Sequence, residues 1–223
     1  MKILLIGFAV IAIGVFATSA VSQPKPDENF HSRRIGFSAG MGVSYLNAQD
    51  IVNTINNSSL GTQRVDDFKS AVEFFGAVTL PVSRDWVMKG EYVYLLASYN
   101  QTTAFGNAEF SYVIHMPTLI IQYMLFEAQR YNLKAGAGVG YHFASYEETF
   151  FASRYTGKGL GTLLELEGNT ALGEDLFAHL GVQTRWDFIG NLTNAQGKSP
   201  LVNIQTTLHF FSVGARLGMT YYF

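Results

Sequence analysis

Apolar and polar residues alternate with a period of two over most of the chain beyond residue 34. Successive side chains of a β-strand point to opposite faces, so this alternation predicts strands with one apolar face and one polar face. The first run begins at Ile35 and the last one ends at Phe223. In the first run, Ile35, Phe37, Ala39, Met41, Val43 and Tyr45 alternate with Gly36, Ser38, Gly40, Gly42 and Ser44.

Six further segments lie between these two runs, and together they predict eight strands. The predicted strands cover residues 35–45, 72–80, 86–96, 110–125, 133–143, 164–169, 176–187 and 211–223. Eight strands make the smallest common transmembrane barrel, and an even number returns both ends of the chain to the same side. We therefore expect one closed antiparallel sheet over residues 35–223.

The fourth predicted strand is less regular than the others. Its apolar residues have one parity from Phe110 to Met116 and the other parity from Leu119 to Leu125. Proline cannot donate a hydrogen bond to a sheet, and β-bulges reset the register of a strand. We therefore predict a β-bulge near Pro117-Thr118.

The predicted connections alternate between short and long. The short ones are residues 81–85, 126–130 and 172–175, and the longer ones are 47–70, 99–108, 150–159 and 189–202. Short periplasmic turns and longer extracellular loops are typical of transmembrane barrels.

Composition indicates whether the apolar face of the strands points outward, toward lipid, or inward, toward a core. Charged residues make up 14% of the chain and hydrophobic residues 48%, whereas a soluble domain carries about 25% charge. A soluble barrel of the lipocalin or avidin type would also alternate, with its apolar face inward. Here the face opposite the apolar one is mostly Gly, Ser, Thr and Ala, which suits a narrow lumen better than a surface in water.

Aromatic residues also gather near both ends of the predicted strands, as in the girdles of membrane barrels. They are Trp86, Tyr131, Tyr221 and Phe223 at one end, and Tyr45, Tyr94, Trp186 and Phe211 at the other. We therefore predict an all-β, eight-stranded antiparallel transmembrane up-and-down β-barrel with its apolar face against lipid. The net charge of -2 argues against a nucleic-acid partner.

The N-terminus predicts export. Lys2 precedes an apolar stretch that ends at Phe16, and small residues follow up to Ala20. This is the pattern of a signal peptide over residues 1–20, cleaved after Ala20. A membrane-anchor helix is the alternative, but it needs about 20 apolar residues. Residues 21–34 then predict a flexible periplasmic leader, and the absence of cysteine excludes disulfides and thiolate metal sites.

Two motifs carry a resemblance to a known family. The chain ends Gly218-Met219-Thr220-Tyr221-Tyr222-Phe223, and residues 116–123 and 133–141 form a hairpin pattern. In these features, residues 35–223 resemble the small outer-membrane β-barrel-domain proteins of Gram-negative bacteria. The resemblance implies integral insertion in the outer membrane and recognition of Tyr221 and Phe223 by the barrel-assembly machinery. It implies little about activity, because one fold serves many roles.

Charged and imidazole side chains gather on the predicted inward face. They are Glu73, Lys89, Glu91, Lys134, His142, Glu165, Glu167, His179, Arg185, Asp187 and Arg216. Because an unpaired buried charge costs several kcal/mol, we expect these groups to pair and fill the lumen. A constricted polar pathway or proton-linked conduit is the functional alternative.

Catalysis has weaker support in the sequence. The Ser/His combinations are His142 with Ser145 and His209 with Ser212, and both spacings put the two side chains on opposite faces of a strand. His115 is expected to point inward. The histidines have no metal-ligand spacing, so we expect neither metal nor cofactor.

These observations favour a non-enzymatic, monomeric outer-membrane barrel with a structural or surface-interaction role, in contact with outer-membrane lipid and lipopolysaccharide. A narrow porin-like channel for small or hydrophobic solutes is the alternative, and a lipid-modifying enzyme is a third possibility. The predicted long connections carry basic and aromatic residues suited to surface binding, among them Arg64, Arg154, Tyr155 and Lys158.

Overall fold

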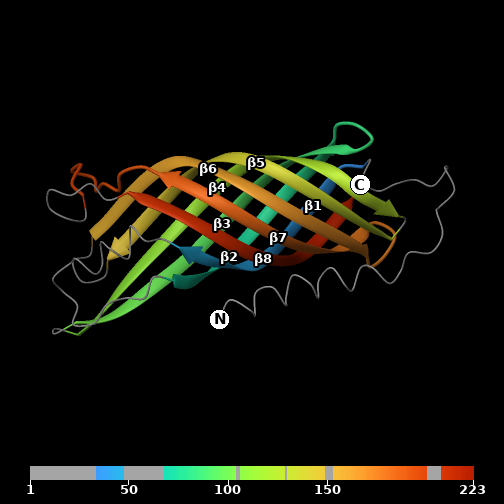
Figure 1. Cartoon of the computed structure of the whole chain (residues 1–223). Helices are drawn as coiled ribbons and strands as arrows, with labels where there is room; N and C mark the ends of the chain where they lie inside the picture. The colour runs from blue at the N-terminus through green and yellow to red at the C-terminus, as the bar shows by residue number, and fades with distance from the viewer. Residues whose placement is uncertain (1–33, 48–67, 104–105, 129, 149–152, 200–206) are drawn as a thin grey trace.

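The computed structural model describes residues 34–47, 68–103, 106–128, 130–148, 153–199 and 207–223. Its eight strands are β1 (Gly36–Asn47), β2 (Phe68–Pro81), β3 (Trp86–Thr103), β4 (Gly106–Ala128), β5 (Tyr131–Glu148), β6 (Ser153–Ala171), β7 (Leu176–Ile189) and β8 (Leu208–Tyr222). Each strand pairs antiparallel with the next, and β1 also pairs with β8, which closes the barrel. The predicted eight-stranded antiparallel up-and-down barrel is therefore confirmed (Figure 1).

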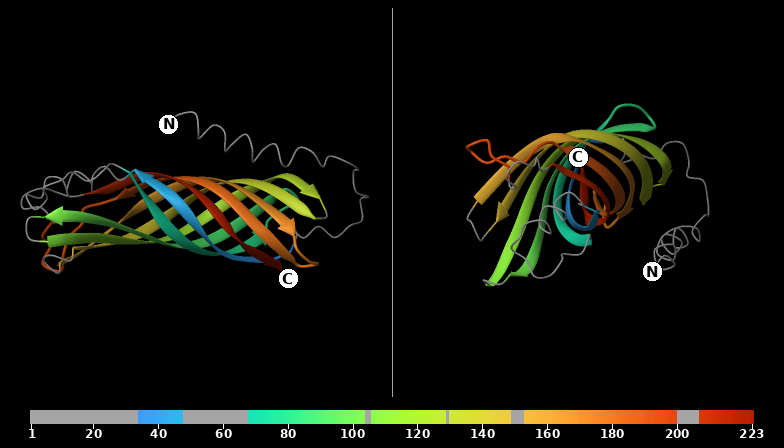
Figure 2. Two further views of the ribbon diagram at one scale, coloured as in Figure 1. Left: turned by 90° about the horizontal axis from the view of Figure 1, so that it is seen from below. Right: turned by 60° about the vertical axis from the view of Figure 1, so that its left-hand side comes forward.

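Alternation along each strand sorts side chains between the inside and the outside of the barrel. In β8, Leu217 and Met219 are 64% and 57% exposed on the outer face, whereas Arg216 and Thr220, which flank them along the strand, are buried. The same division runs around the whole barrel, whose strands are tilted against its axis (Figure 2). The outer face is a continuous apolar belt, because large hydrophobic residues of all eight strands are exposed there.

The predicted aromatic residues near the strand ends also lie on this outer face. Trp86 contacts Tyr123 edge-on, with ring centroids 5.1 Å apart, at the end that carries the short turns. Trp186 packs near Phe211 toward the other end, with centroids 5.5 Å apart. The barrel therefore presents paired outward aromatics toward both of its rims.

The β-bulge predicted at Pro117-Thr118 is wrong. The register between β4 and β5 is the same at His115, before the proline, as at Thr118, after it, and the shift occurs instead between Met124 and Phe126. The apolar parity changes for another reason: Tyr112, Ile114 and Met116 point into the barrel, where apolar side chains fill part of the interior. Apolar residues therefore occupy both faces of this part of β4.

Two connections predicted as long loops are mostly strand. β3 continues to Thr103 and β4 begins at Gly106, while β5 continues to Glu148 and β6 begins at Ser153. The described residues of these predicted loops, 99–103, 106–108 and 153–159, therefore belong to the far ends of long strands (Figure 1). Most of the predicted loop at 47–70 and the end of the one at 189–202 lie outside the described residues.

The opposite end carries tight turns and both ends of the barrel domain. Residues 82–85 join β2 to β3, and residues 172–175 join β6 to β7. Arg34 donates to the carbonyl oxygen of Phe223 at 2.8 Å and to the carboxylate of Asp175 at 2.5 Å. The first and last described residues are thus tied together at one rim, which we call the turn end; the other rim is the hairpin end.

The predicted signal peptide over residues 1–20 and all of the predicted leader over 21–34 except Arg34 lie outside the described residues. In the described part of the chain, no helix is both long enough and apolar enough to cross a bilayer.

The interior has three layers. Near the turn end, the rings of Phe177 and Tyr222 are buried and meet edge-on, with centroids 5.2 Å apart. Charged and amide side chains occupy the middle. Toward the hairpin end lies an apolar cap, formed by Leu46, Ala71, Phe75, Val93, Leu95, Ala97, Tyr112, Ile114, Met116, Ala144, Tyr146, Tyr155, Ile189, Leu192, Leu208 and Phe210.

Candidate functional site

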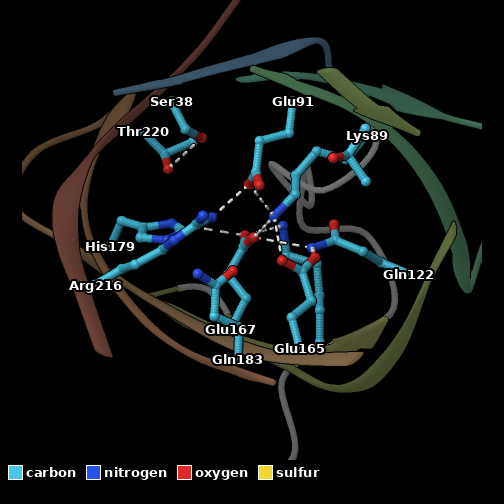
Figure 3. A network of polar contacts seen from close by, with 12 residues as sticks. Ser38, Lys89, Glu91, Gln122, Glu165, Glu167, His179, Gln183, Arg216 and Thr220 are labelled. Atoms are coloured by element: carbon cyan, nitrogen blue, oxygen red, sulfur yellow. Dashed lines mark hydrogen bonds and ion pairs between the residues drawn. The ribbon is translucent and has the colours of Figure 1, made fainter. Parts of the chain in front are cut away.

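The structure places all eleven charged and imidazole residues of the predicted lumen set on the inward face. Ten of them are buried as whole residues, and the side chain of the eleventh, Glu165, is only 5% exposed. They come from β2, β3, β5, β6, β7 and β8, and the members drawn in Figure 3 converge on the middle of the barrel. We call this set, with the amide and hydroxyl groups it contacts, the lumen network.

Glu91 on β3 is the centre of one half of the network. Its two carboxylate oxygens each accept a hydrogen bond at 2.7 Å, one from Arg185 and the other from Arg216. The ammonium nitrogen of Lys89 is 3.5 Å from the second oxygen. One carboxylate therefore holds cations from β3, β7 and β8, across the full width of the lumen.

Glu73 on β2 binds the other side of Arg216. It accepts a hydrogen bond from the guanidinium Nε at 2.6 Å and another from the amide of Gln183 at 2.9 Å. The Arg216 guanidinium also lies over the ring of Phe75, 4.9 Å from its centroid. Glu73 and Glu91 together fix Arg216 in one position.

Lys89 and Lys134 hold the remaining carboxylates. Lys89 donates to Glu165 at 2.7 Å and to Glu167 at 2.9 Å, and Lys134 lies 2.7 Å from the other oxygen of Glu167. The amide of Gln122 donates to both glutamates, at 2.7 Å and 2.9 Å. These contacts join β3, β4, β5 and β6 into the second half of the network.

His142 and Asp187 form a separate pair closer to the hairpin end. The Nδ1 atom of His142 hydrogen-bonds the carboxylate of Asp187, and its Nε2 atom lies 3.3 Å from the hydroxyl of Thr118. The imidazole fits because Gly161 faces it: a Cβ atom there would overlap the ring and the Asp187 carboxylate. The pair is thus held by a hydrogen bond and by the space that Gly161 leaves.

The network sets five carboxylates against four permanent cations and two histidines. Their side chains are almost completely shielded from solvent. Charges taken out of water must be paired, and deleting one member of a buried pair costs about 3–5 kcal/mol. The arrangement can therefore hold the strands around it together and block the lumen.

Several network members had no signal of their own in the sequence. Thr118, Gln122 and Gln183 are uncharged, and only their inward parity along a strand could have identified them. The expected inward position of His115 is wrong. Its ring lies on the outer side, where Nδ1 is 2.6 Å from the hydroxyl of Tyr92.

The predicted Ser/His combinations are split between the two faces. His142 is buried in the lumen, whereas Ser145 lies on the outer side and accepts a hydrogen bond from Arg154 at 2.8 Å. His209 is exposed and Ser212 is buried. Among the described residues, no group of three or more histidine and acidic side chains is placed to hold a metal ion.

The last strand ends with its aromatic residues on both faces. Tyr221 and Phe223 lie outward, with ring centroids 4.8 Å apart, and the amide of Phe223 donates to the carbonyl of Ile35 at 2.9 Å. Tyr222 points inward between them. The end of the chain is thus paired with the start of β1 at the turn end.

No protein-family model and no curated protein sequence matches the chain. Among solved structures, it is similar to Neisserial surface protein A, with a TM-score of 0.55 and 11% identity over 85% of this chain and 97% of the other. It is also similar to the outer membrane protein OprG from Pseudomonas aeruginosa, with a TM-score of 0.52 and 14% identity over 87% and 99%. The chain therefore has the fold of small outer-membrane β-barrel proteins of Gram-negative bacteria.

Proposed function

We propose that this protein is an integral outer-membrane β-barrel with a closed lumen, whose role is structural or lies in surface interaction. Three features support the membrane location: the export pattern before Ala20, the apolar belt around the barrel, and the fold shared with outer-membrane proteins. The apolar belt would then be in contact with outer-membrane lipid and lipopolysaccharide. On this proposal the protein works as a monomer, without cofactor or catalysis.

The observation that carries the proposal is the filling of the lumen. Arg185 is the largest fully buried side chain among the described residues, and it lies between the carboxylate of Glu91 and the sulfur of Met116. The apolar cap lies on the side of Arg185 toward the hairpin end, and Phe177 and Tyr222 lie on its side toward the turn end. An ion crossing the barrel would have to displace paired charges and then enter an apolar layer.

Planar-bilayer recording on the refolded full chain tests this proposal. We expect no conductance steps above leak from protein whose mobility on a gel changes with heating, as a folded barrel requires. Arg185→Ala and the control Lys198→Ala, on an exposed rim segment, should both stay silent, because the apolar cap still closes the lumen in either variant. Wild-type steps well above leak that disappear in Arg185→Ala or Glu165→Ala would instead identify a pore.

A narrow channel for hydrophobic solutes is the second candidate, and the apolar cap favours it. The half of the lumen toward the hairpin end is lined by buried aliphatic and aromatic side chains, so an apolar solute would be compatible with it. Transfer of a fluorescent apolar solute into proteoliposomes that conduct no ions would support this role. Equal transfer into protein-free liposomes would exclude it.

The C-terminal strand supports a proposal about assembly. Tyr221 and Phe223 lie on the outer face beside the closing seam between β1 and β8. We propose that the barrel-assembly machinery recognises these two side chains. Substitution of both by Ala should lower the amount of folded barrel in the outer membrane while leaving refolding from urea into detergent intact.

A further inference from the structure

The outer surface carries a polar cleft at the hairpin end, directly above the apolar belt. We call it the rim cleft; its volume is about 640 Å³, and its lining includes His115, Ser145, Arg154, Lys158 and Asn191. Lys158 on β6 pairs across the sheet with Phe143 on β5, and residues 141 and 160 below them belong to the belt. The cleft therefore lies where the apolar surface ends.

Lys158 is one of the two cationic side chains that line the rim cleft. It is exposed and makes no ion pair or hydrogen bond with a side chain in the part of the chain that the structure describes. The carbonyl oxygen of Lys158 accepts from the amide of Gly190 at 3.0 Å, so the backbone at this position is fixed while the ammonium group stays available. Such a group at the edge of an apolar belt is suited to an anion at the membrane surface.

The side chains of Arg154 and His115 line the same cleft. Arg154 uses its Nε atom for Ser145, at 2.8 Å, and lies 3.4 Å from the exposed carboxylate of Glu147, so its two terminal amino groups remain available. The Nδ1 atom of His115 is 2.6 Å from the hydroxyl of Tyr92. A lysine and an arginine side chain, with an imidazole and one carboxylate beside them, match a phosphate group.

A separate, shallow apolar groove lies in the belt beside the rim cleft. Its volume is about 730 Å³, and its lining includes Gly76, Gly90, Leu119, Val139, Tyr141 and Leu160. Tyr141 and Leu160 are the next outward residues below Phe143 and Lys158, about 7 Å along their strands. A Cβ atom on Gly90 would meet nothing within 4 Å, so glycine leaves this part of the outer surface hollow.

We propose that the rim cleft and the apolar groove together bind one phosphorylated lipid of the outer leaflet. Its phosphate contacts Lys158 and Arg154, and one acyl chain lies in the groove over Gly90. The hairpin end faces the outside in barrels of this topology, so the inference rests on the outer-membrane location proposed above. The groove distinguishes a lipid from free phosphate, because a free anion would leave it unused.

Native mass spectrometry of the refolded full chain, titrated with diphosphorylated lipid A in detergent, tests this site. Lys158→Gln combined with Arg154→Gln should weaken the 1:1 adduct about tenfold or more, as expected for lost hydrogen bonds to a charged group. Gly90→Leu should weaken it about fourfold by displacing part of the acyl chain. The controls Arg84→Gln and Gly173→Leu, in exposed turns at the opposite end, should stay within about twofold of wild type.

Three results would overturn the proposal: equal affinity for lipid A from which the phosphates have been removed, an unchanged adduct in the double variant, or full competition by inorganic phosphate at equal concentration. Equal binding of phosphatidylglycerol would keep the phosphate site but reassign its occupant to phospholipid. A chain that inserts into bilayers and shows any of the first three results loses this inference and keeps the proposed function. A chain that forms no barrel in bilayers loses both.

Discussion

Replacement of Glu91 by glutamine should be among the most damaging single changes inside this barrel. The carboxylate accepts hydrogen bonds from two arginines at 2.7 Å and lies 3.5 Å from a lysine, with its side chain fully buried. Glutamine keeps the shape, but it removes the charge and turns an N–H donor toward one of the guanidinium groups. Lys89, Arg185 and Arg216 then lie close together in the lumen without the carboxylate that they all contact.

Breaking a buried ion pair by removing one partner costs about 3–5 kcal/mol. At 1.36 kcal/mol for each factor of ten, the folding equilibrium constant should fall by roughly two to nearly four powers of ten. Removing one excess cation as well should recover part of this loss, so Glu91→Gln with Arg185→Gln should cost less than the sum of the two single changes, by about 1–3 kcal/mol.

Equilibrium urea unfolding in lipid vesicles measures these differences through the fluorescence of Trp86 and Trp186. Both tryptophans lie on the outer face, 47% and 37% exposed, so their emission reports transfer from lipid to water. Glu174→Gln, in the exposed turn before β7, is the matched control and should stay within about 0.5 kcal/mol of wild type. A Glu91→Gln barrel as stable as this control would refute the assignment of Glu91 as the shared anion.

Further substitutions test the packing and the rim contacts. Gly161→Ala should destabilise the barrel by about 1–3 kcal/mol in the same urea assay, because the added methyl group overlaps His142 and Asp187; Gly173→Ala, with open space around it, should be neutral. Arg34→Gln removes an ion pair at the turn end whose side chains are about one-third exposed, so its cost should be at most about 1 kcal/mol and should shrink further in high salt. A loss above 2 kcal/mol for Arg34→Gln would show that the chain ends at the rim are coupled to the folding of the whole barrel.

The strand order and the inward positions of the charged residues could be predicted because both follow from local alternation. Glu165 and Glu167 share a face because they are two residues apart in one strand. Which cation each glutamate meets could not be predicted: Arg216 contacts Glu73 and Glu91 from 143 and 125 residues away along the chain. Those pairings depend on the stagger of strands around a closed barrel, which alternation within one strand does not specify.

The mistake at Pro117 has a physical origin in the interior. If apolar residues always lay on the outer face, a change of apolar parity would require a bulge. In fact the lumen is polar in its middle and apolar toward the hairpin end, where Ile114 and Met116 point inward beside Leu95. Where both faces of a strand are apolar, alternation carries no information about register.

The hairpin tips could not be predicted for a related reason. Residues 99–103 and 106–108 are rich in Asn, Gln, Thr and Gly, which are typical of loops. They are nevertheless strand, because β3 and β4 keep pairing without interruption from Trp86 with Tyr123 to Thr103 with Gly106. Once the hydrogen-bonded ladder between two strands is established, each added residue pair needs little further ordering of the chain. Polar residues at the end of the ladder therefore also adopt strand structure.

In the lumen, small residues on one strand leave space for large residues on the neighbouring strands. The small inward residues of the sequence pattern are therefore compatible with a barrel whose lumen is closed. Gly136 and Gly138 of β5 face inward, where Cβ atoms would come within about 3 Å of the side chains of Gln122 and Ile120. The space these glycines leave is therefore already occupied by β4. A run of small inward residues indicates an open channel only if its neighbours are small as well, and in this barrel they are glutamine, isoleucine and glutamate. The alternation that identifies the inward residues thus also indicates that their side chains fill the lumen. A binding site of this barrel is therefore expected on its outer surface.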